Sequence, residues 1–218
     1  MAVTVVRKFN KTQIPTDFFS IKEQQKINKF LLNNLQLGLD IEVGCGVGLH
    51  PLEYARLNES KKIIALERTK TKFNKFLNRF NSHLKNQPKL QDHLLPVGED
   101  AIAFILKFIK QKTVDNYFLL HPNPYPKLKH LNKRWHAMPA MSLLVETLKP
   151  GGCIHLATNQ EYYYKEALSY MQNIWKLSVK SKNTYYKNDI KGRTHFEIKY
   201  LNMGDAIFNV IFQKPMLD

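Results

Sequence analysis

The chain of 218 residues is long enough to bury a substantial core, and it is most economically one domain. Its composition is 44% hydrophobic and 23% charged, as in an ordinary globular protein, and no apolar run is long enough for a signal peptide or a membrane span. The 33 Lys and Arg residues outnumber the 18 Asp and Glu residues, and the resulting net charge of +15 favours a polyanionic partner over small substrates and membrane surfaces, although a basic proteome would also explain it.

The two cysteines, Cys45 and Cys153, do not form a CxxC pair. They cannot build a zinc site alone, and they do not resemble a disulfide framework. A reducing cytoplasm is therefore the expected location.

Residues 1–37 are predicted to form an irregular basic lead-in and then a helix that is closed by Gly38. Strands and helices alternate five times after that glycine. The predicted strands cover 39–44, 61–67, 93–97, 114–120 and 152–158, the predicted helices cover 49–58, 69–85, 100–111, 138–149 and 160–173, and a last strand covers 206–214. This alternation predicts a mostly parallel sheet with helices on both faces, in which ligands bind beyond the carboxyl ends of the strands.

The first strand ends in EVGCGVG, which contains Glu42, Gly44, Gly46 and Gly48. Glycines between a strand and a helix let the backbone turn tightly and approach a ligand closely. The G-x-G-x-G spacing differs from the G-x-G-x-x-G of nicotinamide-binding proteins. A purely structural turn is the alternative explanation.

Acidic residues follow the next two strands. Glu67 ends the second strand, where a carboxylate can accept hydrogen bonds from both ribose hydroxyls of a nucleoside. Glu99 or Asp100 follows the third strand and can meet an adenine amino group. The alternatives are a solvated Glu at the start of a helix and an Asp that caps one.

This order of glycine loop, ribose carboxylate and third-strand acid resembles the cofactor half of the Rossmann-like, class I S-adenosylmethionine-dependent methyltransferases, as does LKPGGCIHLAT at 148–158. The resemblance implies an α/β fold with a mostly parallel central sheet, helices on both faces and an antiparallel C-terminal strand. It implies S-adenosylmethionine as the cofactor. It also implies one methyltransferase domain over 1–218, with the cofactor-binding core at 38–158 and a substrate-side part at 159–218.

Three further segments are similar to those of bacterial tRNA (guanine-N7)-methyltransferases. HPNPYPKLKHLNKR at 121–134 resembles that family's FPDPWPK and its basic run. LATNQEYYYKEAL at 156–168 resembles ATDWEPYAEWM, and GRTHFEIKYLNMG at 192–204 resembles RPVTKFEQRGLRLG. With the first loop, the likeness covers about residues 38–204, which identifies the chain as a divergent member.

The resemblance assigns roles position by position. The implied cofactor contacts are Glu42, Gly44, Gly46, Glu67 and Asp100, and the implied substrate contacts are Lys127, Asn159, Thr194 and Glu197. Asn123 lies where the family has a catalytic aspartate, and Asn159 also replaces an aspartate. Tyr125 replaces a tryptophan and can stack on a splayed base or pack against the prolines.

Methyl transfer to guanine N7 needs mainly proximity and alignment, because N7 carries an exposed lone pair. A nearby carboxylate would stabilise the positive charge that develops on the purine, and Asn123 lacks that charge. We therefore expect Glu197 to supply it. The alternatives are a methyltransferase for another RNA base or a small molecule, and a catalytically weak RNA-binding protein on the same scaffold.

The basic run at 127–134 contains Lys127, Lys129, Lys133 and Arg134, which we expect to contact phosphates at the rim of the active site, unless the run is simply a solvated loop. Four more cations, Lys70, Lys72, Lys75 and Arg79, are expected on the wet face of one helix. His136 and His155 lack partners at metal-ligand spacing, so no metal is expected.

Overall fold

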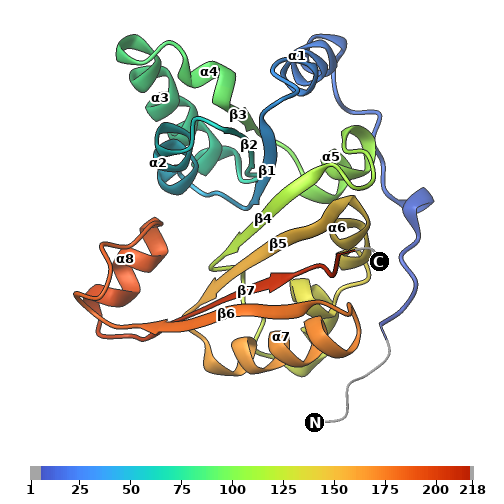
Figure 1. The fold of residues 1–218 in the computed structure, drawn as a ribbon, viewed down its shortest axis with the longest axis vertical. Helices are drawn as coiled ribbons and strands as arrows, with labels where there is room; N and C mark the ends of the chain where they lie inside the picture. Colours follow the sequence, from blue (N-terminus) through green and yellow to red (C-terminus); the bar gives the residue numbers. More distant parts are fainter. Residues whose placement is uncertain (1–5, 217–218) are drawn as a thin grey trace.

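The computed structural model describes residues 6–216, so the first five residues of the predicted lead-in and the last two residues of the chain lie outside it. A seven-stranded sheet runs through the protein in the order β3-β2-β1-β4-β5-β7-β6 (Figure 1). Its strands are β1 (Gly38–Val43), β2 (Lys61–Leu66), β3 (Leu94–Val97), β4 (Val114–Leu120), β5 (Leu148–Thr158), β6 (Ser178–Tyr185) and β7 (Ile207–Gln213). The first five are parallel, whereas β7 is antiparallel to both β5 and β6. The predicted Rossmann-like fold with an antiparallel C-terminal strand is confirmed.

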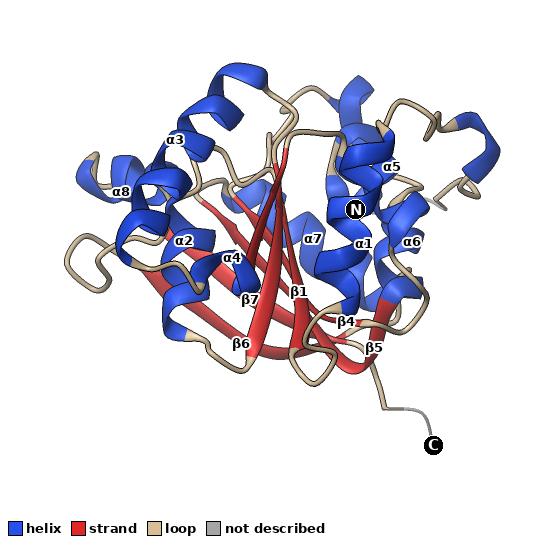
Figure 2. Cartoon of the chain, turned by 90° about the horizontal axis from the view of Figure 1, so that it is seen from above, coloured by secondary structure: helices blue, strands red, loops and turns tan. Residues whose placement is uncertain are grey.

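Helices cover both faces of the sheet (Figure 2). One face packs against α1 (Ile21–Leu32), α5 (Ala101–Phe108), α6 (Met141–Thr147) and α7 (Glu161–Asn173). The other face packs against α2 (Leu49–Leu57), α3 (Lys70–Asn86), α4 (Leu90–His93) and α8 (His195–Asn202). Within β2, Ile64 and Leu66 point to the first group and Ile63 and Ala65 to the second. Burial on both sides explains why this strand is a continuous apolar run.

Short 3-10 helices lie outside these layers, at Lys11–Gln13 (η1), Leu128–Lys133 (η2) and Trp135–Ala137 (η3). No helix within residues 6–216 is long and apolar enough to cross a membrane.

Several elements differ from the expectation. The structure adds α4, α8 and the edge strand β6, and α5 and α6 are shorter than their predicted helices. The predicted helix at 138–149 overran its true end because Leu148 already pairs with Val114 of β4. The Pro-Gly-Gly sequence then lies inside β5, where the N–H of Gly151 donates to the carbonyl of Lys214 at 2.9 Å.

The chain segment that contains α8 lies at the carboxyl edge of the sheet. Because β7 is antiparallel to β5, with Thr158 opposite Phe208, β7 starts at the edge where β5 ends. The chain between β6 and β7, which contains α8, therefore returns to the edge where β1, β2 and β4 also end. Figure 2 shows α8 on the same side of the sheet as α2 and α3.

Candidate active site

The glycine loop after β1 adopts a left-handed backbone at all three glycines, with φ of +74° at Gly44, +62° at Gly46 and +78° at Gly48. A Cβ atom at Gly44 or Gly46 would meet nothing within 4 Å, so these two residues face open space. A Cβ atom at Gly48 would lie 1.9 Å from the ring of Phe76 on α3. The first two glycines therefore leave room for a ligand, while the third lets α3 pack against the loop.

Glu67 connects the end of β2 to this loop. Its side chain is buried, and its two carboxylate oxygens accept hydrogen bonds from the backbone N–H groups of Gly46 at 3.0 Å and Thr69 at 2.7 Å. A carboxylate oxygen has more than one acceptor site, so each oxygen can accept a further bond from a ligand. The geometry places the predicted ribose acceptor directly beside the glycines.

Glu42 is buried under the same loop, where its Oε2 lies 2.8 Å from Nδ1 of His50. His50 belongs to the first turn of α2, and no sequence motif pointed to it. Burial, together with the charges of Glu42 and Glu67, raises the pKa of the Cys45 thiol well above its ordinary value. The neutral thiol is unsuited to nucleophilic catalysis, which needs the thiolate.

Asp100 caps α5. Its Oδ1 accepts hydrogen bonds from the N–H groups of Ile102 at 2.9 Å and Ala103 at 3.2 Å, and its Oδ2 lies 3.8 Å from Arg68. The capping alternative is therefore realised, and the contact with the cofactor stays a prediction.

A pocket of about 330 Å³ opens between the glycine loop, α3 and the start of α8. Three of the predicted cofactor residues, Glu42, Gly44 and Gly46, line it together with Thr194 from the predicted substrate segment. Its remaining lining is Cys45, Val47, Leu49, Thr71, Lys72, Lys75, Arg79, Leu120, His195 and Phe196. Glu67 and Asp100 are not part of this wall. The pocket thus joins the cofactor half of the chain to the C-terminal part.

The proline-rich turn after β4 is held by Asn123 itself. Oδ1 of Asn123 accepts a hydrogen bond from the N–H of Tyr125 at 3.2 Å, and Tyr125 has a left-handed φ of +44°. An aspartate could accept the same bond, so the amide preserves the turn while it removes the charge. The Tyr125 ring is half-buried beside the basic run, with Nζ of Lys133 at 5.9 Å and His130 at its edge.

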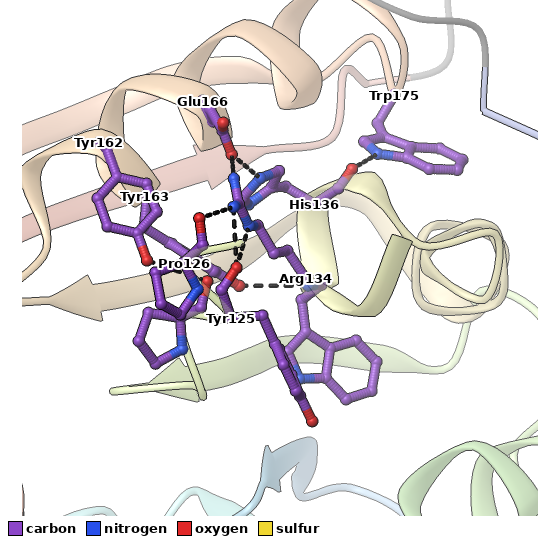
Figure 3. Close-up of polar contacts among 10 residues, drawn as sticks. Tyr125, Pro126, Arg134, His136, Tyr162, Tyr163, Glu166 and Trp175 are labelled. Atoms are coloured by element: carbon purple, nitrogen blue, oxygen red, sulfur yellow. Dashed lines mark hydrogen bonds and ion pairs between the residues drawn. The ribbon is translucent and has the colours of Figure 1, made fainter. Parts of the chain in front are cut away.

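Arg134 corrects one expectation, since it is 1% exposed and does not lie at the rim (Figure 3). Its guanidinium donates to the carbonyls of Tyr125, at 3.1 and 2.9 Å, and Pro126, at 3.3 Å. It also forms an ion pair with Glu166 of α7. A charged side chain at this depth is tolerated because its N–H groups are paired. Arg134 therefore fastens the turn from inside.

Tyr162 of α7 and His136 add further contacts around the same turn. We call Arg134, Glu166, Tyr162 and His136 together the Arg134 clamp (Figure 3). The hydroxyl of Tyr162 donates to the carbonyl of Pro124 at 3.1 Å, and the Arg134 guanidinium lies 5.2 Å from the centre of the Tyr162 ring. Nε2 of His136 lies 3.2 Å from Glu166, and burial lowers the pKa of His136 in spite of that carboxylate. The turn is thus fixed to one helix by several contacts.

Glu197 is fully buried and paired with Arg193. Its carboxylate accepts the backbone N–H of Arg193 at 2.6 Å and two guanidinium N–H groups at 2.6 and 3.0 Å. Burial alone would raise the pKa of Glu197, but His121 and Arg193 outweigh it and lower the pKa far below its ordinary value. His121 lies 3.6 Å away, longer than a good hydrogen bond, so Arg193 is the main stabilising partner.

Thr194 caps α8, because its Oγ1 accepts the N–H of Glu197 at 3.0 Å. Asn159, at the end of β5, donates from Nδ2 to Oδ2 of Asp205 at 3.0 Å. A carboxylate therefore stands one side chain away from the position where the family has an aspartate. Lys127 is exposed at the start of η2.

The structure thus brings Glu42, Gly44, Gly46 and Thr194 into one pocket. Glu197 and Asp100 are near this edge but are engaged in internal contacts, and Asn123, Tyr125 and Lys127 lie on the clamped turn. Among the residues that the structure describes, no group of three or more His, Cys, Asp and Glu side chains is placed to hold a metal ion.

Solved structures share the fold at low sequence identity. The 16S rRNA methyltransferase KamB superposes with a TM-score of 0.59 at 15% identity and covers 90% of this chain and 94% of its own. The [4+2]-cyclase SpnF reaches 0.57 at 12% identity, over 89% of this chain and 82% of its own. Two such different names at similar scores show that the likeness reports the fold alone.

Sequence relatives are more specific. A protein of Nitrosomonas europaea named tRNA (guanine-N(7)-)-methyltransferase is 25% identical over 80% of this chain and 75% of its own length. Its namesake in Neisseria gonorrhoeae (strain NCCP11945) is 24% identical over 80% of this chain and 71% of its own. Residues 38–210 match the family described as "Putative methyltransferase", which spans the glycine loop, the clamped turn and the α8 segment. The chain belongs to this family of methyltransferases and is a divergent member of it.

Proposed function

We propose that the protein transfers a methyl group from S-adenosylmethionine to N7 of a guanine in tRNA. The observation that carries the proposal is the pocket in which the glycine loop meets Thr194, because it brings the cofactor half beside the segment that resembles a substrate site. The names of the relatives support the same reaction. The proposal also implies a cytoplasmic protein with tRNA as its partner.

The residues present fit S-adenosylmethionine. The open space at Gly44 and Gly46 gives room for a ligand that a β-carbon would exclude, and the oxygens of Glu67 can accept the ribose hydroxyls. Asp100 keeps one carboxylate oxygen outside its capping bonds, and that oxygen can meet the adenine amino group. Glu42 lies beneath the loop as the acid nearest to Gly44 in the chain.

When bound, S-adenosylmethionine supplies an electrophilic methyl group, which is attacked by the N7 lone pair while the electrons of the C–S bond return to sulfur. The chain needs no proton acceptor for this step, and its task is to hold the guanine in line. The clamped turn suits that task, because Asn123, Tyr125 and Lys127 occupy a segment that Arg134 fixes to α7.

The carboxylate that stabilises the purine was expected to be Glu197. Its two oxygens accept three hydrogen bonds from Arg193 and its side chain is fully buried, so the geometry favours a supporting role for it. Asp205 is the more accessible carboxylate, since it is half-buried and accepts a hydrogen bond from Asn159, which directly follows β5. We propose that Asp205, held by Asn159, supplies the carboxylate that the family has at the position of Asn159.

The direct test is to incubate the protein with S-adenosylmethionine and unmodified total tRNA, digest the RNA, and identify methylated nucleosides by mass spectrometry. New 7-methylguanosine is the expected result. A different methylated nucleoside would refute guanine N7 as the target while it leaves the cofactor in place. Cofactor binding without methylation would favour a protein that binds RNA on this scaffold.

A further inference from the structure

The face of α3 that looks into the pocket is made of cations. Lys72, Lys75 and Arg79 are spaced three and four residues apart, so they share one face of the helix, and all three line the pocket. The adjoining face of α3 is apolar and packs on the sheet through Phe76 and Phe80. Positive charge is therefore concentrated where α3 meets the glycine loop.

Among residues 6–216, these three cations lack a carboxylate partner. Within the described residues, none of them lies within 4 Å of an acidic oxygen, whereas elsewhere Lys61 and Lys149 both pair with Asp115. The acid of the pocket wall, Glu42, is already paired with His50. Lys72 only lies over the ring of Phe196, at 5.5 Å. Like charges this close repel one another, and a bound anion would relieve that repulsion.

We propose that Lys72, Lys75 and Arg79, which we call the α3 cation face, bind the phosphates of the RNA strand that carries the target nucleotide. The inference rests on the proposed function, because it takes RNA as the substrate. Arginine offers a planar fork to phosphate oxygens and lysine a compact charge. Because the same wall contains Gly44 and Gly46, a strand held on α3 delivers its base to the cofactor loop.

The cofactor's own carboxylate is the competing anion. It carries one charge, whereas the α3 cation face extends over about 10 Å, since Arg79 follows Lys72 by seven helical steps of 1.5 Å each. One carboxylate offers a single charge to three cations, whereas successive phosphates of a strand offer one charge each. A bound polyanion would therefore explain why all three cations share this face of α3.

The experiment compares the triple variant K72Q/K75Q/R79Q with the charge-matched control K85Q/K89Q/K110Q. The control residues are exposed, and Lys89 and Lys110 precede β3 and β4 at the opposite edge of the sheet. Affinity for unmodified tRNA is measured by fluorescence anisotropy across a salt series, and affinity for S-adenosylmethionine by calorimetry. Circular dichroism checks that both variants remain folded.

We expect K72Q/K75Q/R79Q to bind tRNA about tenfold more weakly or worse at low salt, and to flatten the slope of log K against log salt by about 2–3. The control keeps the wild-type slope to within about 1, and both variants keep the wild-type affinity for the cofactor. Equal slopes in the two variants, or a loss confined to cofactor affinity, would overturn the α3 cation face as a phosphate site. Because these assays need no turnover, they can support the site even if the wild-type protein methylates a different base.

Discussion

Glu197 and Asp205 both lie near the carboxyl edge of the sheet, but their carboxylates differ in burial and in hydrogen bonding. Glu197 is 0% exposed and surrounded by the donors of Arg193, while Asp205 is half-buried and accepts one bond from Asn159. A buried carboxylate enclosed by internal donors stabilises the fold, and a partly exposed one can meet a ligand. The two residues therefore give separate predictions.

Glu197→Gln should lower stability at neutral pH by on the order of 2 kcal/mol, because the buried end of Arg193 loses its counter-charge. The pKa of Glu197 is lowered on folding, so its stabilisation is complete above its ordinary value near 4.5 and declines as the pH falls below it. The difference in Tm between wild type and variant, measured from pH 3 to 8, should thus shrink below about pH 4.5. A constant difference would contradict the ion pair, and a loss of kcat without a loss of Tm would restore the catalytic role.

Asp205→Asn should reduce kcat for tRNA methylation by about 10²-fold, the usual cost of one well-placed electrostatic partner. The exchange variant N159D/D205N returns the carboxylate to the neighbouring side chain and should recover most of the rate. Steady-state kinetics give kcat for both variants, and affinity for S-adenosylmethionine is measured as the control. Wild-type kcat in D205N would exclude Asp205 as the compensating acid.

At the scale of elements, the sequence predicted those that carry strong apolar periodicity. The five parallel strands and the helices between them were found because buried strands are short apolar runs bounded by turns. The edge strand β6 was missed because Ser178–Tyr185 is mostly polar and half-exposed, as edge strands often are. The eight residues of α8 were recognised only as a family segment, since so short a helix shows little periodicity.

Arg134 shows the limit of such reasoning at the site. A cation at the end of a basic run is normally solvated, so the sequence predicted Arg134 at the rim of the active site. Its burial depends on Glu166, which is 32 residues further along the chain and meets it only after α7 has packed on the sheet. Residues at or just after a strand end, such as Glu42 and Gly46, could be predicted from the sequence. Glu166 could not, because only tertiary packing brings it to Arg134.

The Arg134 clamp predicts a coupled loss of stability and rate. Arg134→Lys keeps the charge but cannot make the forked contacts, so we expect a loss on the order of 3 kcal/mol, or about 6–12 °C in Tm. Below that melting point, kcat should fall because the turn that carries Asn123 is no longer fixed, while affinity for S-adenosylmethionine stays unchanged. Asn132→Ala, an exposed and uncharged change in the same segment, serves as the control. Faster amide exchange at Tyr125 in R134K but not in N132A would identify the mobile turn, and unchanged exchange with unchanged kcat would refute the clamp.

At the scale of the whole molecule, the cofactor should bind the folded chain and stabilise it. S-adenosylmethionine at 100 times its Kd should add about 2.7 kcal/mol, or about 5–11 °C in Tm. Glu67→Gln should lose most of that shift, because an amide cannot accept from Gly46, Thr69 and a ribose together. Glu59→Gln, an exposed change beyond α2, should keep it.

A thermal melt of the three proteins with and without the cofactor measures this, and NADH is the matching negative ligand. A shift with NADH, or a full shift in E67Q, would contradict the assignment of the glycine loop.

The contact between Gly48 and Phe76 joins the glycine loop to α3. Because Phe76 occupies the space where a side chain at Gly48 would be, the glycine loop and the helix that carries Lys72, Lys75 and Arg79 are in direct contact. If RNA bound to α3 displaces this helix, the loop has to move with it, and binding of the two proposed ligands would be coupled. Reciprocity then requires that RNA change the affinity for S-adenosylmethionine by the same factor as S-adenosylmethionine changes the affinity for RNA.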